Sequence, residues 1–394
     1  MVWKQTCPMS EKRQFVEDVE SDHWSMTELC VRYGISRKTG YALLRRFELE
    51  GDAAFDKRSR APHSCPHRTA DELEALIVAE RKARRWGARK LLHVLRQRHP
   101  ELDWPARSTV HDILLRHGMV KPKRRRKKWA HPGAGVAEAS APNEVWTTDF
   151  KGQFRTGNGI YCYPLTIVDL HSRFLLRITA LPNVRTVHVK PVFEQLFRQF
   201  GLPDAIRSDN GSPFASTGIH GLCTLNAWWM RLGIVHQRIQ PSSPQQNGAH
   251  ERMHRTLKAS TTRPPAKNRV GQQKKFDAFV DEFNHERPHE SLDDDTPASR
   301  YKPSPRPFPE RIPKPEYPGH CEHRRVSNAG CFRFGARQVF LSQALGGDVI
   351  GLEEIADGLW NILFYTTLLG RFDERSGKIS GADFRTEAGG AGWL

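Results

Sequence analysis

Apolar residues recur at helical spacing over residues 11–50, which predicts three short helices. Ser25 and Glu28 form the pattern of a capping box at the start of the second helix, and Gly34 supplies the turn that follows it. The third helix is expected to turn three side chains to solvent, namely Arg37, Lys38 and Tyr41. A helix, a glycine turn and a basic helix are typical of a helix-turn-helix, so residues 1–60 are predicted to bind DNA. A small three-helix module of another kind is the alternative.

A second helical module is predicted over residues 66–120. Trp86-Gly87 interrupts the apolar pattern once, and the stretch from Pro100 to Pro105 interrupts it again. The third helix of this module would present Arg107 and Ser108. We expect a second helix-turn-helix that contacts DNA through these two residues.

From residue 143 to residue 302 the pattern changes to strands that alternate with helices. The expected strands are Val145–Lys151, Tyr163–Asp169, Leu175–Thr179, Ala205–Ser208 and Ile234–Ile239. The expected helices are Thr186–Phe200, Thr224–Leu232, Gly248–Ser260 and Lys274–His285. A meander of strands followed by strand–helix alternation predicts an α/β domain with a mixed sheet and helices on its faces.

The end of the chain has a different pattern again. Residues 303–318 contain seven prolines, which predicts a stiff spacer. Short strand-like runs separated by glycine turns follow over residues 319–394, and this spacing predicts a small C-terminal β-barrel. We therefore expect a multidomain protein with all-α, α/β and β parts.

Positive charge is concentrated in the first third of the chain. The formal net charge is +17, and residues 1–132 account for +12 of it. Seven of the eight residues from Lys121 to Lys128 are basic, among them Arg124, Arg125 and Arg126. A polyanion partner is therefore expected, with the linker 121–142 following DNA phosphates; a merely solvated linker is the alternative.

Composition also excludes several classes of protein. No run reaches the roughly 18 apolar residues that a membrane span needs, and the N-terminus lacks the pattern of a secretory signal. The seven cysteines are scattered, which favours reduced thiols over a disulfide framework. We expect a cytoplasmic protein that, in a bacterium, associates with the nucleoid and not with a membrane.

Three carboxylates lie where a metal site could form. Asp149 ends the apolar run that starts at Val145, and Asp209 follows the run 205–208 and opens Asp209-Asn210-Gly211. Glu251 lies near the start of a predicted helix. Hard cations such as Mg²⁺ take oxygen ligands, and two strand ends and one helix can converge on one site. We therefore predict Asp149, Asp209 and Glu251 as metal ligands and catalytic residues.

Each carboxylate also has a simpler interpretation. An aspartate before Asn-Gly commonly forms a turn, and a glutamate on a helix is commonly solvated. The predicted helix face of Glu251 also bears His254, Arg255 and Lys258, which we interpret as a cationic stripe with Lys258 as a phosphate contact.

Other candidate ligands are assigned to structural roles. Asp169 is expected to serve a turn or cap, and Asp293-Asp294-Asp295 to lie on a loop without converging on an ion. The clusters at 63–67 and 320–323 lack a matching pair, so no zinc site is predicted.

Taken together, the motifs resemble those of transposases of bacterial insertion sequences that carry a retroviral-integrase catalytic core. The matching segments are Trp146-Thr147-Thr148-Asp149, Ser208-Asp209-Asn210-Gly211, Asn247-Gly248-Ala249-His250-Glu251-Arg252, Lys258 and Asn284-His285-Glu286-Arg287-Pro288-His289. The interval from Asp209 to Glu251 is longer than in the commonest members, with the extra length expected around Ser216–Cys223.

The resemblance implies an RNase H-like core in which the two aspartates and the glutamate bind two Mg²⁺ ions, with Mn²⁺ as a possible substitute. It further implies hydrolysis at the element end, followed by attack of the freed 3′ hydroxyl on target DNA. The implied partners are double-stranded DNA, as terminal inverted repeats and as target, and further copies of the chain in a dimer or larger assembly. A structure-selective nuclease and a non-catalytic DNA-binding regulator are the competing hypotheses.

Overall fold

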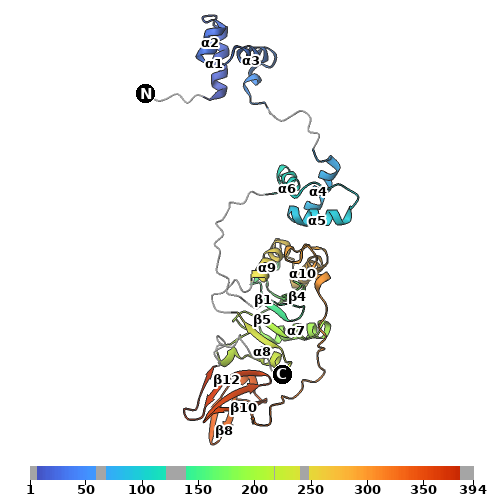
Figure 1. Ribbon diagram of the computed structural model, residues 1–394, viewed down its shortest axis with the longest axis vertical. Coiled ribbons are helices and arrows are strands. Elements are labelled where there is room, and N and C mark those ends of the chain that lie inside the picture. Colours follow the sequence, from blue (N-terminus) through green and yellow to red (C-terminus); the bar gives the residue numbers. More distant parts are fainter. Residues whose placement is uncertain (1–6, 59–67, 121–138, 217, 240–247, 382–394) are drawn as a thin grey trace. The chain divides into compact units, whose positions relative to one another are not determined.

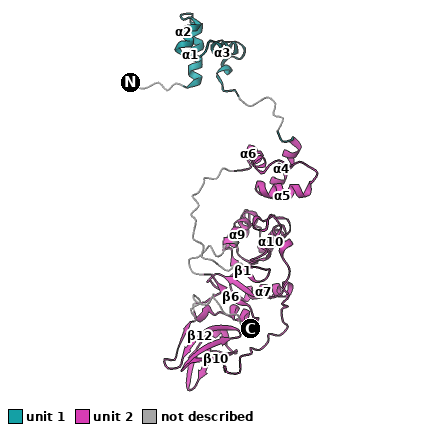
Figure 2. Ribbon diagram, in the orientation of Figure 1, with its two compact units in different colours: residues 1–70 teal, residues 71–394 magenta. Residues whose placement is uncertain are grey.

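The computed structural model describes residues 7–58, 68–120, 139–216, 218–239 and 248–381. The chain divides into two compact units, residues 1–70 and 71–394 (Figures 1 and 2). Residues 121–138 of the predicted basic linker lie outside the described residues, and Arg124, Arg125 and Arg126 are among them.

The first unit is built from short helices. They are α1 (Pro8–Glu20), α2 (Met26–Arg32), α3 (Arg37–Glu50) and the 3-10 turn η1 (Gly51–Phe55). The capping box between Ser25 and Glu28 forms as predicted, because each side chain bonds the other's backbone N–H. Phe15, Leu29 and Phe55 are buried between the helices. Three helices pack around one small core, as expected.

The second helical module begins the larger unit. Its helices are α4 (Asp71–Arg84), α5 (Ala88–Arg98) and α6 (Arg107–Arg116). They bury a common core that includes Ile77, Leu91, Trp104 and Ile113. The breaks at Trp86-Gly87 and before Arg107 fall between helices, where the sequence placed them.

A mixed sheet forms the centre of the larger unit, in the strand order β4-β3-β1-β5-β6, with β2 paired to the start of β3. The strands are β1 (Val145–Phe150), β2 (Phe154–Arg155), β3 (Tyr161–Asp169), β4 (Leu175–Leu181), β5 (Ala205–Ser208) and β6 (Val235–Arg238). β1, β3 and β4 are antiparallel, whereas β1, β5 and β6 are parallel. The predicted mixed sheet is therefore confirmed.

Helices cover both faces of this sheet. They are α7 (Thr186–Phe200), α8 (Thr224–Arg231), α9 (Gly248–Thr261) and α10 (Arg269–Asp281), with the shorter turns η2 (Ile219–Gly221), η4 (Glu282–Glu286), η5 (Glu290–Leu292) and α11 (Pro297–Arg300). α7 and α8 pack on the face that carries Trp146, and α9 and α10 pack on the face that carries Val168. The alternation of side chains along the strands thus separates two apolar cores.

The last predicted helix of the core is wrong at both ends. α10 begins at Arg269 because Asn268 caps it by accepting from the N–H of Gly271. It ends at Asp281, and the chain continues in the π-helical turn η4 and not as α-helix to His285.

The proline-rich segment runs along the core instead of standing clear of it. Arg306 donates to the carbonyls of Pro203, Leu232 and Gly233, and its carbonyl accepts from the N–H of Leu202. Phe308 stacks on Phe197. The spacer is therefore fixed to the sheet domain at this end.

The C-terminal part is a β-domain. Its strands are β7 (Glu322–Arg325), β8 (Cys331–Phe334), β9 (Arg337–Phe340), β10 (Val349–Ala356), β11 (Leu359–Phe364), β12 (Thr367–Asp373) and β13 (Lys378–Gly381), with the turn η6 (Gln343–Leu345). Five of them form an antiparallel sheet in the order β13-β12-β11-β10-β7, and β8 pairs with β9. Among the described strands the sheet is open, so the predicted barrel is not confirmed.

The β-domain shares a core with the sheet domain. Leu222, Ala227 and Met230 lie in the same buried cluster as Phe332 and Ile362. The segment around Ser216–Cys223, where extra length was expected, supplies part of this contact, because Leu222 belongs to it. This segment therefore helps to hold the β-domain.

Candidate active site

Two of the three predicted carboxylates lie at the carboxyl ends of neighbouring parallel strands, Asp149 within β1 and Asp209 directly after β5. β1 pairs with β5 so that Val145 lies opposite Ala205 and Thr147 opposite Arg207. Asp149 and Asp209 each lie two residues beyond the last of these pairs. Carboxyl ends of parallel strands meet at one edge of a sheet, which is a common position for a site.

The turn at Asp209 is fixed by hydrogen bonds. The N–H of Gly211 donates to Oδ1 of Asp209 at 3.2 Å, and Nδ2 of Asn210 donates to the carbonyl of Ile239 at 2.7 Å. Ser208, one residue earlier, is hydrogen-bonded to the buried ring of His236 at 2.8 Å. The turn interpretation of Asp209 is therefore correct, and it leaves the carboxylate at an exposed position.

Glu251 lies in the first turn of α9. Met253 and Leu257 of this helix are buried against the sheet, whereas Glu251 and Lys258 are exposed. The segment 240–247 that leads into the helix lies outside the described residues.

The charges of the three carboxylates act on one another. Burial, the charge of Asp209 and, more weakly, that of Glu251 raise the pKa of Asp149 to about 7. Like charges disfavour ionisation when they are near. Among the described residues, the ligand atoms of the three carboxylates do not form a group as close as that of Asp149, His250 and His254. Such a set of oxygen donors suits a divalent cation, which would relieve the repulsion.

Buried polar side chains stand behind Asp149. The hydroxyl of Thr166 donates to the carbonyl of Asp149 at 2.9 Å. It is also hydrogen-bonded to the rings of His250, at 2.5 Å, and His254, at 2.8 Å. The other nitrogen of His250 bonds the hydroxyl of Thr147 at 3.0 Å. These side chains connect α9 to β1 and β3.

His254 therefore does not belong to the cationic stripe that the sequence predicted. Its ring is buried, and burial, together with His250, lowers its pKa to about 2, so that it is neutral. Arg255 and Lys258 remain exposed on α9. The helical spacing of these residues was correct, but spacing alone does not show which of them lies on the buried face of the helix.

Asp149, His250 and His254 could themselves hold a metal, because their ligand atoms lie within 4.8 Å of one another. Both ring nitrogens of His250 already bond threonine hydroxyls, and Nε2 of His254 bonds Thr166. We interpret the two histidines as support for Asp149, since their nitrogens are engaged with the sheet.

The carboxylates that the sequence analysis assigned to structural roles have such roles in the structure. Asp169 is buried and accepts from the backbone N–H groups of Asn143 and Ser172 and from the hydroxyl of Ser172. Asp294 pairs with Arg89, and Asp295 pairs with Arg300. None of these three joins the neighbourhood of Asp149.

The predicted DNA contacts lie on exposed helix starts. Arg37, Lys38 and Tyr41 are exposed on the first two turns of α3. Arg107 and Ser108 are exposed at the start of α6. Both sets remain predictions, and their positions are those expected of recognition helices.

Family models match successive parts of the chain. An integrase core domain matches residues 139–244, and a second integrase core model matches residues 232–297. A helix-turn-helix domain matches residues 11–63, and a homeodomain-like domain matches residues 39–114. The chain thus contains an integrase core domain behind helix-turn-helix domains.

Curated relatives of the chain include insertion-element and retroviral proteins. The chain is 26% identical over 226 residues to an uncharacterised protein of insertion element IS407 of Burkholderia multivorans, covering 55% of this chain and 76% of that protein. It is 28% identical over 175 residues to an uncharacterised protein of IS476 of Xanthomonas euvesicatoria, covering 44% and 47%. It is 34% identical over 137 residues to the Gag-Pol polyprotein of Avian reticuloendotheliosis virus, covering 32% and 11%.

The chain therefore spans about three quarters of one insertion-element relative, about half of the other, and a small part of the polyprotein. Among solved structures, the integrase catalytic core domain of HTLV-2 in complex with magnesium aligns with 41% of this chain and 98% of that chain, at 15% identity and a TM-score of 0.31. No helix in the described part of the chain is long and apolar enough to cross a membrane.

Proposed function

We propose that this protein is a DNA transposase that binds the ends of its own mobile element, hydrolyses a phosphodiester there and joins the freed 3′ hydroxyl to target DNA. The observation that supports the proposal is the parallel pairing of β1 with β5, since Asp149 and Asp209 each lie two residues beyond its last pair. The charge of Glu251 on Asp149 adds the third carboxylate.

Asp149, Asp209 and Glu251 would hold two divalent ions, Mg²⁺ or in its place Mn²⁺. Bound ions of this kind activate an attacking oxygen and neutralise charge on the leaving oxygen of a phosphodiester. Asp149 is the central ligand, because its carbonyl is fixed by Thr166 and its carboxylate faces His254. Asp209 is set by its turn, and Glu251 by the buried face of α9.

DNA binding is assigned to the two helical modules. Their candidate contacts are Arg37, Lys38, Tyr41, Arg107 and Ser108, and the basic linker with Arg124, Arg125 and Arg126 would follow phosphates between them. Lys258 would contact DNA beside the carboxylates. Because two element ends must be joined in one reaction, we propose that the active form is a dimer or larger assembly on paired ends.

The test uses the full chain, a duplex that carries the element's terminal repeat, and Mg²⁺. Asp149→Asn and Glu251→Gln should each abolish end cleavage and strand joining, while binding of the duplex stays within about twofold of wild type, because a charge is lost only at the metal site.

Asp281→Asn is the matched control, since Asp281 is an exposed carboxylate of the same domain with a side chain 75% exposed. It should leave both steps unchanged. Cleavage without joining by the wild-type protein would indicate a nuclease instead, and binding without either reaction would indicate a DNA-binding regulator. Joining at the wild-type rate by either triad variant would refute the ligand assignment.

A further inference from the structure

A second polar cavity lies on another side of α9. It has a volume of about 380 Å³ and lies between α5 of the second helical module and the segment from η4 to η5. Its charged lining residues are Lys90, Arg173, Arg252, Arg287, His289 and Glu290. Asp149, Asp209 and Glu251 do not line it, although Thr147 and His250, which stand behind Asp149, do.

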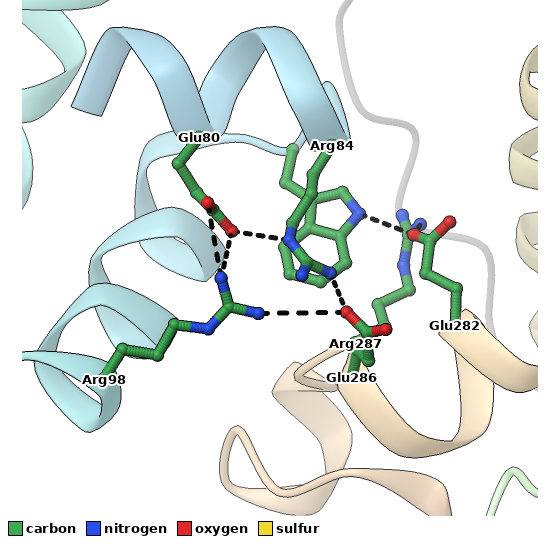
Figure 3. A network of polar contacts seen from close by, with 7 residues as sticks. Glu80, Arg84, Arg98, Glu282, Glu286 and Arg287 are labelled. Atoms are coloured by element: carbon green, nitrogen blue, oxygen red, sulfur yellow. Dashed lines mark hydrogen bonds and ion pairs between the residues drawn. The ribbon is translucent and has the colours of Figure 1, made fainter. Parts of the chain in front are cut away.

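Near Arg287, which lines the cavity, ion pairs join the second helical module to the core (Figure 3). Arg84 and Arg98 of the module each pair with Glu80 of the module and with Glu286 of the core. Nε1 of Trp86 donates to Oε1 of Glu282 at 3.1 Å. These contacts hold the module against η4. They also pair the carboxylates of the network with cations or with the indole N–H.

Arg89 forms ion pairs with two further carboxylates on this side of the module. Its guanidinium lies 2.5 Å from Glu290 and 3.0 Å from Asp294. In the described part of the chain no ion pair joins either acid to the neighbouring Lys90, whose amine is partly buried. Burial and the nearby charge of Arg287 lower the pKa of Lys90 to about 8. Lys90 thus forms no ion pair among the described residues, although the charges of Asp294 and Glu290 favour its protonated form.

Arg287 has one long ion pair, and His289 is neutral because burial and the charges of Lys90 and Arg287 lower its pKa to about 3. The guanidinium of Arg287 lies 4.0 Å from Glu282, which is also the acceptor of Trp86, and it stands over the indole ring of Trp86. Nε2 of His289 is buried and has no hydrogen-bond partner among the described residues. Cations that gather in a partly buried space repel one another, and an entering anion would offset that repulsion.

Four cationic side chains and one carboxylate thus surround a cavity large enough for a tetrahedral anion. Lysine and arginine together suit phosphate, because arginine supplies paired N–H groups and lysine a compact charge. Ser291 lines the same space and has a hydroxyl that can donate as well. We propose that this cavity is a phosphate-binding pocket that locks the second helical module to the integrase core.

The phosphate could be a free anion or a phosphodiester of bound DNA. Both share the chemistry that the pocket offers. Binding of the phosphate does not involve the three carboxylates, so the pocket can be tested even if the proposed transposase activity fails.

The experiment is calorimetric titration of the full chain with inorganic phosphate at constant ionic strength. Lys90→Gln should weaken phosphate binding about tenfold or more, the usual effect of losing one charge-assisted hydrogen bond. Lys90→Arg should restore most of it. Lys82→Gln is the matched control, since Lys82 is an exposed lysine of the same module, and it should bind phosphate like wild type.

Absence of phosphate binding by the wild-type chain, or equal binding by the Lys90→Gln and Lys82→Gln variants, would overturn the proposal. A second titration identifies the source. If phosphate competes with an element-end duplex in the wild type but not in Lys90→Gln, the occupant is the DNA backbone. If duplex and phosphate bind together, the occupant is a free anion.

Discussion

His254 faces Asp149, with Nδ1 of its ring 3.8 Å from Oδ2 of the carboxylate. The same ring bonds Thr166, whose hydroxyl donates to the carbonyl of Asp149. The side chain and the main chain of Asp149 are thus both contacted by one group of buried polar residues. Residues that hold a metal ligand in place commonly affect metal affinity as much as activity.

His254→Ala should therefore lower the rate of strand joining by about 10–100-fold, and it should raise the Mg²⁺ concentration needed for half of the maximal rate. His254→Gln, which keeps a polar group near Thr166, should recover part of both. His285→Ala is the control, because His285 is 58% exposed in the same domain. Single-turnover kinetics over a range of Mg²⁺ concentrations measures both quantities. A slower rate with an unchanged Mg²⁺ requirement would argue against this positioning role.

Asp149 also predicts a pH dependence of the metal-free protein. Its pKa is raised to about 7 by burial and by the charges of Asp209 and Glu251, whereas an unfolded aspartate titrates near 3.9. Ionisation of Asp149 therefore opposes folding. That cost is absent below about pH 4, grows between about pH 4 and pH 7, and is complete above.

Asp149→Asn removes this cost, so the variant should become more stable than wild type as the pH rises through this range. The difference in the free energy of unfolding should reach about 2–4 kcal/mol above pH 7 in the presence of a chelator. Denaturant titrations at several pH values measure it. Mg²⁺ should stabilise only the wild type, and Asp281→Asn should show no such trend. A constant difference at all pH values would contradict the raised pKa.

Much of this site could be predicted from the sequence because it depends on strand ends. The runs before Asp149 and Asp209 are short, apolar and followed by turn residues, so their strands were recognisable. β7 and β13 are largely exposed edge strands, so period-two alternation did not mark them. The support of Asp149 by His254 depends on which edge of α9 is buried, and spacing alone does not contain that information.

The arrangement of the domains could not be predicted from the sequence either. Leu222 and Met230 are apolar residues of the sheet domain, and nothing in their spacing tells that they pack against a β-sheet more than a hundred residues later. Closure of a barrel likewise depends on whether the edge strands pair, which turn spacing cannot determine.

Lys258 provides a test of the DNA path. It is exposed near the end of α9, on the helix that bears Glu251. Lys258→Ala should weaken binding of the element-end duplex and lower the slope of log affinity against log salt by about 1, because one phosphate contact is lost. Lys274→Ala, at an exposed lysine of α10, is the control. Fluorescence anisotropy at several salt concentrations measures the slopes. A defect that does not change with salt would indicate a folding fault instead.

Arg231 and Asp348 hold the β-domain to the sheet domain. Nε of Arg231 lies 3.1 Å and 3.2 Å from the two carboxylate oxygens, and both side chains are only 21% exposed. Nη2 of the same arginine donates to the carbonyl of Ala344. Removal of one partner leaves the other charge partly buried and unpaired, which is costly.

Arg231→Met should therefore lower the free energy of unfolding by about 2–3 kcal/mol, and Asp348→Asn by a similar amount. The double variant should lose less than the sum, because the second substitution removes a charge that the first has already left unpaired. Denaturant unfolding of the four proteins completes the cycle. Arg198→Met is the control, since Arg198 makes a comparable pair with Glu194 on the surface of α7 and should cost below about 1 kcal/mol. Strictly additive losses would show that the two side chains do not act together, and the β-domain would then be held by its apolar core alone.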